Sequence, residues 1–161
     1  MYEKLLSLAD HFGLKVVEDT LPLRLKGLYA DGVACINRKI PYVAKGCTLA
    51  EEIGHHHTSF GNILDKTSLS SRKQEQRARR YGHQILIPLN RFIDAGQARV
   101  EGRHDVAEWL GITEEFLQES IDYYQQKFGL YVVVEEHLIH FDPLYVTKAS
   151  CWLGTHYMRF G

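Results

Sequence analysis

The chain has 161 residues, of which 45% are hydrophobic and 24% are charged, and its formal net charge is −1. These values are ordinary for a globular protein, and the length suffices for one domain with a full hydrophobic core. The near-neutral charge gives no global attraction to nucleic acid or to an anionic membrane surface.

The cysteines and the N-terminal sequence both indicate the cytoplasm. Cys35, Cys47 and Cys151 are odd in number and lack C-x-x-C spacing, which is typical of reduced thiols rather than of a disulfide framework. The first residues, MYEKLLSLADHFG, carry charges among the leucines and lack the apolar core of a signal peptide. No stretch has the length of an apolar membrane span, so we expect a cytoplasmic protein that does not enter the membrane.

The first part of the chain predicts one helix, one strand and a β-hairpin. Apolar residues follow a helical period over residues 2–12, and Gly13 is placed to end that helix. The run LKVVED predicts a short strand. Asp31-Gly32 then separates two β-like runs, which predicts an antiparallel pair formed by residues 27–30 and 33–37.

Two capping-box patterns predict the starts of two longer helices. Thr48 with Glu51 predicts a helix that begins at Thr48 and ends before residue 61. Ser71 with Gln74 predicts a second helix that runs from Ser71 to residue 87, just before a proline.

The rest of the chain predicts shorter helices and further β-structure. Helices are expected near residues 89–95 and 105–110, and a stronger one is capped by Thr113 and ended by Gly129. LYVVVEEHLIHF is β-rich and fits one or two strands, while the tail CWLGTHYMRFG has no clear period. These elements predict an α+β fold that is mostly helical, with a small antiparallel sheet near the start.

The stretch LAEEIGHHHTS places three ionisable residues at the spacing of a metallopeptidase helix. Glu51 and His55 are four residues apart and share one helix face, as two metal ligands would. Glu52 is offset by one position, where the glutamate of an H-E-x-x-H helix acts as general base. The alternative is a charged helix in which Glu51 only completes the capping box with Thr48 and the following histidines lie at the surface.

Glu75, on the second of these helices, belongs to the stripe that is expected to pack inward. The stripe also contains Ala78 and Ile85, and a buried carboxylate without a partner is costly. A metal ion shared with His55 would supply that partner; a salt bridge to Arg72 or Arg79 is the alternative. The other basic residues of SRKQEQRARR predict a solvated face, and we do not expect direct binding to nucleic acid.

The chain contains the block LAEEIGHHHTSFGN, followed by the block RKQEQRARRYGHQILIP. Together these blocks resemble the ImmA/IrrE family of zinc metallopeptidases, in particular its branch from prophages and mobile elements of Gram-positive bacteria. The hairpin GLYADGVACIN before these blocks and DVAEWLGITEEFLQE after them also fit. The resemblance extends from about Gly27 to Phe128. It implies a zincin-like metallopeptidase core over about residues 14–100, with a helical and β extension over about residues 101–161, in a single domain of residues 1–161.

The resemblance also implies a function and the residues that serve it. The protein would be a cytoplasmic zinc endopeptidase that cleaves a helix-turn-helix repressor of a phage or mobile element. Glu52 would be the general base, and His55 and Glu75 would be zinc ligands. The family's first histidine falls on Glu51, which we expect to be the third ligand, because glutamate binds zinc at about 2.0–2.2 Å. Such a carboxylate-rich site also suits manganese or iron.

Two other functions fit the same sequence. The chain could bind the repressor without cleaving it, with a degenerate metal site, or it could contact DNA through the arginine-rich helix. A histidine, His56, His57 or His83, is a candidate for stabilising the oxyanion of a peptidase reaction, and the sequence does not choose between them.

Overall fold

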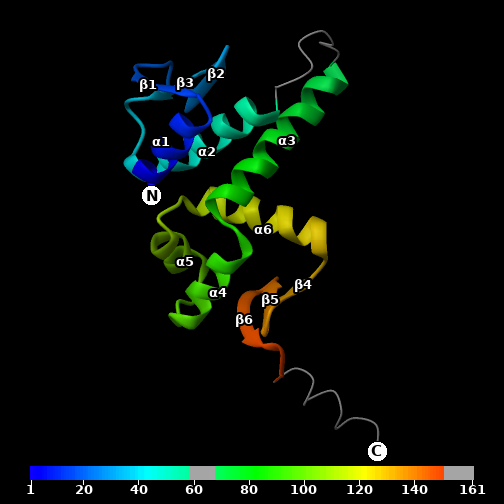
Figure 1. Ribbon diagram of the computed structural model, residues 1–161. Coiled ribbons are helices and arrows are strands. Elements are labelled where there is room, and N and C mark those ends of the chain that lie inside the picture. Colours follow the sequence, from blue (N-terminus) through cyan, green and yellow to red (C-terminus); the bar gives the residue numbers. More distant parts are fainter. Residues whose placement is uncertain (59–67, 151–161) are drawn as a thin grey trace, which may run out of the picture. The chain divides into compact units, whose positions relative to one another are not determined.

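The computed structural model describes residues 1–58 and 68–150, with side chains described for all of these except residues 68–71 (Figure 1). The described residues form an α+β fold with two small three-stranded sheets. The chain divides into two compact units. The first contains Met1–Leu86 with Gly111–Thr113, and the second contains Ile87–Leu110 and the residues from Glu114 onward.

In the first unit, helix α1 and a three-stranded sheet precede two longer helices. The elements are α1 (Tyr2–His11), β1 (Lys15–Asp19), β2 (Gly27–Ala30), β3 (Val33–Asn37), α2 (Tyr42–Thr58) and α3 (Ser68–Leu86). The first helix ends as predicted, with Gly13 at a φ of 71°. The core comes from α1, β3 and α2, and includes Leu5, Ile36, Leu49 and Ile53.

The predicted hairpin is confirmed, but the sheet is not purely antiparallel. β2 pairs antiparallel with β3, and the turn residues Asp31 and Gly32 have φ values of 46° and 77°, as a two-residue hairpin turn requires. β1 pairs parallel with β3, giving the order β1-β3-β2. A hairpin signal reports only on neighbouring strands, whereas β1 pairs with a strand that is distant in sequence, so the prediction of an antiparallel sheet missed this pairing.

The two long helices begin earlier than the capping boxes predicted. The carbonyl of Pro41 accepts a hydrogen bond from the Lys45 amide at 3.0 Å, so α2 starts right after the proline and buries Thr48 in its interior. Helix α3 begins at Ser68, three residues before Ser71. Both capping-box assignments are therefore wrong, because the S/T-x-x-E/Q pattern also arises inside helices where no N-terminus is present.

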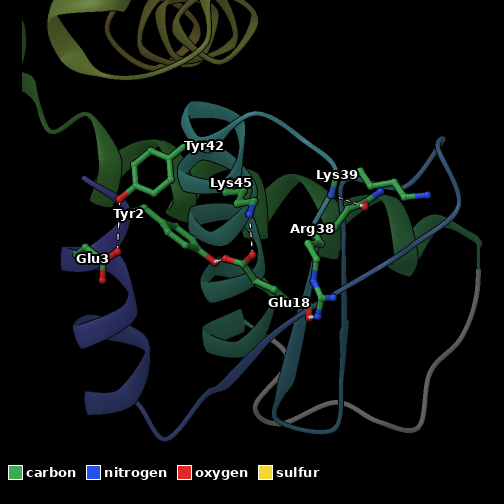
Figure 2. A network of polar contacts seen from close by, with 8 residues as sticks. Tyr2, Glu3, Glu18, Arg38, Lys39, Tyr42 and Lys45 are labelled. Carbon is green, nitrogen blue, oxygen red and sulfur yellow. Dashed lines mark hydrogen bonds and ion pairs between the residues drawn. The ribbon is translucent and has the colours of Figure 1, made fainter.

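A polar network joins α1, β1 and α2 within this unit (Figure 2). Glu18 of β1 accepts a hydrogen bond from the Tyr2 hydroxyl at 2.9 Å and pairs with the Lys45 ammonium at 2.6 Å. The hydrogen bond from Lys45 is the main reason that the pKa of Glu18 is lowered. Arg38 also donates to the Glu18 carbonyl at 2.9 Å. The network ties the outer strand β1 to both neighbouring helices.

The second unit packs short helices against an antiparallel sheet. Its elements are α4 (Leu89–Gln97), α5 (Arg103–Leu110), α6 (Glu114–Phe128), β4 (Tyr131–Val134), β5 (His137–Phe141) and β6 (Leu144–Lys148). The sheet order is β4-β5-β6. Phe92, Tyr124 and Phe141 form its aromatic core, with ring centroids 5.9 to 6.4 Å apart. LYVVVEEHLIHF is thus two strands, and β6, which the sequence did not predict, completes the sheet.

None of the helices in residues 1–58 and 68–150 combines the length and apolar character that a bilayer crossing requires. The tail 151–161, which showed no period in the sequence, lies outside the described residues.

Candidate active site

Helices α2 and α3 approach each other closely because glycines lie at their contact points. A Cβ on Gly54 would overlap the Ala78 carbonyl of α3, and a Cβ on Gly82 would lie 3.0 Å from the Ala50 carbonyl of α2. Ala50 and Ala78 are fully buried, so small residues line both sides of the contact. This packing carries the ionisable side chains of α2 to within reach of those of α3.

The structure brings His55 and Glu75 together. The His55 Nε2 lies 3.4 Å from the Glu75 Oε2, while the Glu75 Oε1 accepts a hydrogen bond from the Arg79 Nε at 2.8 Å. The Glu75 side chain is 46% exposed, compared with 25% for His55. Glu75 therefore lies beside His55 and also forms the salt bridge to Arg79, one turn further along α3, that the sequence offered as the alternative to a shared metal ion.

His55 is held in the protonation state that a metal ligand needs. Burial lowers the pKa of its imidazole, and the charge of Arg79 lowers it further, while Glu75 acts in the opposite direction. The neutral imidazole is thus favoured near pH 7, and only the neutral ring offers a lone pair to a metal ion.

Glu52 is the most deeply buried carboxyl group of the candidate site. The residue is 7% exposed, and burial, followed by repulsion from Glu51 and Glu75, raises its pKa to about 7. Its Oε1 lies against β2, where a Cβ on Gly27 would be only 2.5 Å away. The absence of a side chain at Gly27 therefore makes room for this carboxyl group, which can take up or release a proton near neutral pH.

Glu51 lies within α2 and not at its N-terminus. With Thr48 buried inside the helix, the capping role that competed with a ligand role for Glu51 is excluded. Glu51 is close enough to raise the pKa values of Glu52 and Cys47. It belongs to the same helix as His55, one turn earlier.

The side-chain oxygen and nitrogen atoms of Glu51, His55 and Glu75 are atom types that bind zinc. The His55–Glu75 pair also has a suitable spacing. Two ligands bound to zinc at about 2.0–2.2 Å in tetrahedral geometry lie roughly 3.4 Å apart, which is the separation of the His55 and Glu75 atoms. Within residues 1–58 and 68–150, no group of three or more His, Cys, Asp or Glu side chains is already arranged to hold a metal ion. Glu51 would have to turn toward the pair to complete the set.

Two residues of β2 that surround this site, Gly27 and Tyr29, carry no motif that predicted them from the sequence. Tyr29 of β2 stacks on His55, with ring centroids 6.4 Å apart and an interplanar angle of 10°. Its hydroxyl lies 3.1 Å from the Nδ1 of His56, which is buried and not at the surface. The period-2 alternation of β2 was the only signal in the sequence that could have placed Gly27 and Tyr29 on the same face.

The other candidate histidines have different surroundings. The His57 ring is exposed and stacks on Tyr81 of α3 at 4.2 Å. His83 is 4% exposed, and burial together with the charge of Arg79 lowers its pKa to about 4. His83 therefore remains neutral throughout the physiological pH range.

No model of a known protein family matches this chain, and a search of curated proteins gives no match either. The resemblance to the ImmA/IrrE family thus rests on the motifs quoted above.

Proposed function

We propose that this protein is a metal-dependent endopeptidase, with zinc as its metal. The observation that carries the proposal is the juxtaposition on α2 and α3 of a buried carboxyl group, Glu52, whose pKa is raised to about 7, and the His55–Glu75 pair. A proton acceptor that titrates near neutral pH beside two donors at ligand spacing is the arrangement that metal-assisted hydrolysis requires.

Each residue has a stated role in this proposal. Glu51, His55 and Glu75 would hold the metal ion, and Glu52 would act as general base. A bound zinc ion would polarise the scissile carbonyl and make water more acidic. A Glu52 carboxylate oxygen accepts a proton from the attacking water and then donates it to the nitrogen of the leaving amine. Burial against Gly27 supports this role, because a carboxylate that is shielded from solvent takes up a proton more readily than an exposed one.

Strand β2 offers a surface for an extended substrate. It is an edge strand in the order β1-β3-β2, and the carbonyl of Lys26, just before it, accepts a hydrogen bond from the Asn37 amide at 2.9 Å. Backbone groups alternate between the two sides of a strand, so those of Gly27 and Tyr29 point away from β3. A peptide that pairs with this edge would lie beside Glu52 and His55, as in a zincin-like arrangement of edge strand and helix.

The resemblance to the ImmA/IrrE family supports the choice of substrate. We propose a helix-turn-helix repressor of a phage or mobile element as the protein that is cleaved, and the cytoplasm as the compartment.

Metal analysis of untagged protein tests the proposal. One zinc ion per chain in the wild type, lost in Glu75→Ala and in His55→Ala, is the expected result. Tyr81→Phe, on the same helix as Glu75 but in contact with His57, is the matched control and retains zinc. A wild-type protein that stays metal-free when zinc is supplied, yet is fully folded, would contradict the proposal.

The second candidate is a module that binds the repressor without cleaving it. Two observations favour it: Arg79 already occupies one oxygen of Glu75, and three donors are not arranged together in the described residues. In that case the untagged protein binds the repressor, carries no metal and leaves the repressor intact.

A further inference from the structure

His56 is fixed at both of its ring nitrogens. Its Nε2 lies 3.0 Å from the carbonyl oxygen of Phe12, just after α1. A carbonyl can only accept a hydrogen bond, so Nε2 carries the proton and donates it. In the neutral ring, Nδ1 then carries a lone pair, which accepts a hydrogen bond from the Tyr29 hydroxyl at 3.1 Å. This chain of two hydrogen bonds connects α1, α2 and β2 in the interior of the first unit.

The same tyrosine also contacts the neighbouring histidine with its ring. Tyr29 lies nearly parallel to His55, at an interplanar angle of 10°, and meets His56 edge-on at 69°. Both geometries are among those that aromatic rings favour. The Tyr29 hydroxyl is therefore held by His56, while its ring lies nearly parallel to the His55 ring, with centroids 6.4 Å apart.

We infer that Tyr29 is a positioning residue for His55: anchored through His56 to the Phe12 carbonyl, its ring limits the tilt of the His55 imidazole and keeps Nε2 directed at Glu75. This inference rests on the proposed function, since it assigns to Tyr29 the orientation of a metal ligand. Orientation of a ligating imidazole by its neighbours is a general requirement of zinc sites. Loss of a hydrogen-bonded neighbour typically weakens metal binding about 10- to 100-fold, and we adopt this range for the stacked ring of Tyr29.

Two substitutions separate the ring of Tyr29 from its hydroxyl. Tyr29→Phe keeps the stacking and removes the bond to His56, whereas Tyr29→Leu removes both. We expect the dissociation constant for Zn²⁺, measured by competition with a chromophoric chelator, to rise less than about 10-fold for Tyr29→Phe. For Tyr29→Leu we expect a rise of about 10- to 100-fold.

Tyr42→Leu is the matched control, because Tyr42 has the same two kinds of contact at the other end of α2. Its ring meets Tyr2 edge-on at 5.5 Å, and its hydroxyl donates to Glu3 at 3.5 Å (Figure 2). Zinc affinity should be unchanged in this variant.

The NMR spectrum of the histidine rings in metal-free protein provides a second readout. In the wild type, the His56 Nε2–H signal should exchange slowly with water. Tyr29→Phe should shift the His56 Nδ1 resonance and preserve the nuclear Overhauser contacts between the His55 ring and the Glu75 side chain. Tyr29→Leu should weaken those contacts, because the His55 ring is then free to tilt away from Glu75.

The two readouts distinguish failure of this inference from failure of the proposed function. Wild-type zinc affinity together with unchanged contacts between the His55 ring and Glu75 in Tyr29→Leu would overturn the inference. If Tyr29→Leu does not fold, Tyr29→Ile replaces it in the same two measurements, because isoleucine also lacks the ring and suits a β-strand. A wild-type protein that binds no zinc refutes the proposed function, and the His55 signals of the variants then still decide whether Tyr29 positions that ring.

Discussion

Glu52 and His83 are both buried, yet burial shifts their pKa values in opposite directions. Loss of solvent disfavours the charged form of each group, which raises the pKa of the Glu52 carboxyl to about 7 and lowers that of the His83 imidazole to about 4. Near pH 7, Glu52 is thus poised between two protonation states, whereas His83 is neutral. This difference suits Glu52 to its proposed role as proton carrier and leaves His83 as a neutral group next to Arg79.

Substitution of Glu52 by glutamine tests its role as general base. Glutamine keeps the size and helix propensity of the side chain but cannot accept the proton, so we expect the rate of repressor cleavage to fall about 10²- to 10⁴-fold. The zinc content and the circular dichroism spectrum should remain those of the wild type. Cleavage by Glu52→Gln at close to the wild-type rate would eliminate Glu52 as the base.

Glu51 is tested by a pair of substitutions with opposite outcomes. Because Glu51 lies inside α2, no cap is lost in Glu51→Gln, and we expect its free energy of unfolding to stay within about 0.5 kcal/mol of the wild type without metal. Its zinc affinity should fall, since an amide is a poor ligand, whereas Glu51→His should match or exceed the wild type. Equal zinc affinity for Glu51→Gln and the wild type would show that another group completes the site.

At the scale of elements, the contact between α2 and α3 holds the proposed site together. His55 and Glu75 belong to different helices, so the 3.4 Å between them depends on how closely the two backbones approach. Gly54 allows that approach at Ala78, and Gly82 allows it at Ala50. Gly54 and Gly82, which have no proposed contact with substrate, thus determine the distance between His55 and Glu75.

Gly54→Ala should therefore destabilise the protein and separate the pair. Alanine improves helix propensity by about 1 kcal/mol, but its methyl group would overlap the Ala78 carbonyl, and we expect a net loss of about 1–3 kcal/mol in unfolding free energy. Gly46→Ala on the same helix is the control: its Cβ would come no closer than 4.0 Å to Met1, so it should stabilise by up to about 1 kcal/mol. Urea denaturation of both variants measures the difference. Equal stability of the two would refute the close-packing argument.

Structural features that depend on a few neighbouring residues were predicted correctly from the sequence, whereas features that depend on tertiary contacts were not. The Asp31-Gly32 turn and the Gly13 terminus depend on the backbone of one or two residues, and both predictions are confirmed. The parallel pairing of β1 and the strand β6 depend on tertiary partners, and both were missed. In the candidate site, the helical period indicated that Glu51 and His55 share a face. It could not reveal Tyr29, because β2 meets α2 only in the folded chain.

At the scale of the whole molecule, the buried ionisable groups make stability depend on pH. The pKa of His83 is lower in the folded chain, so below its ordinary pKa of 6.5 the unfolded chain binds a proton that the folded chain does not. The stability due to neutral His83 is complete above pH 6.5 and is lost as pH falls toward 4. A shift of this size corresponds to about 3 kcal/mol.

His83→Gln should therefore weaken the acid sensitivity of the protein. In metal-free samples, the difference in unfolding free energy between variant and wild type should change in favour of the variant, by up to about 3 kcal/mol, as pH falls from 6.5 to 4. Thr20→Ala, at an exposed residue of the same unit that has no titratable side chain, should give a flat difference curve. Identical curves for the two variants would mean that His83 is not held neutral by burial.

Incubation with candidate helix-turn-helix repressors of phages and mobile elements tests the central claim most directly. Mass spectrometry of the repressor, with zinc or with a chelator present, reads out whether a peptide bond has been hydrolysed. We predict discrete fragments that form with zinc, disappear with chelator, and are absent in both conditions for Glu52→Gln. A repressor that binds the wild-type protein and remains intact in the presence of zinc would contradict the proposed peptidase activity and favour the binding module.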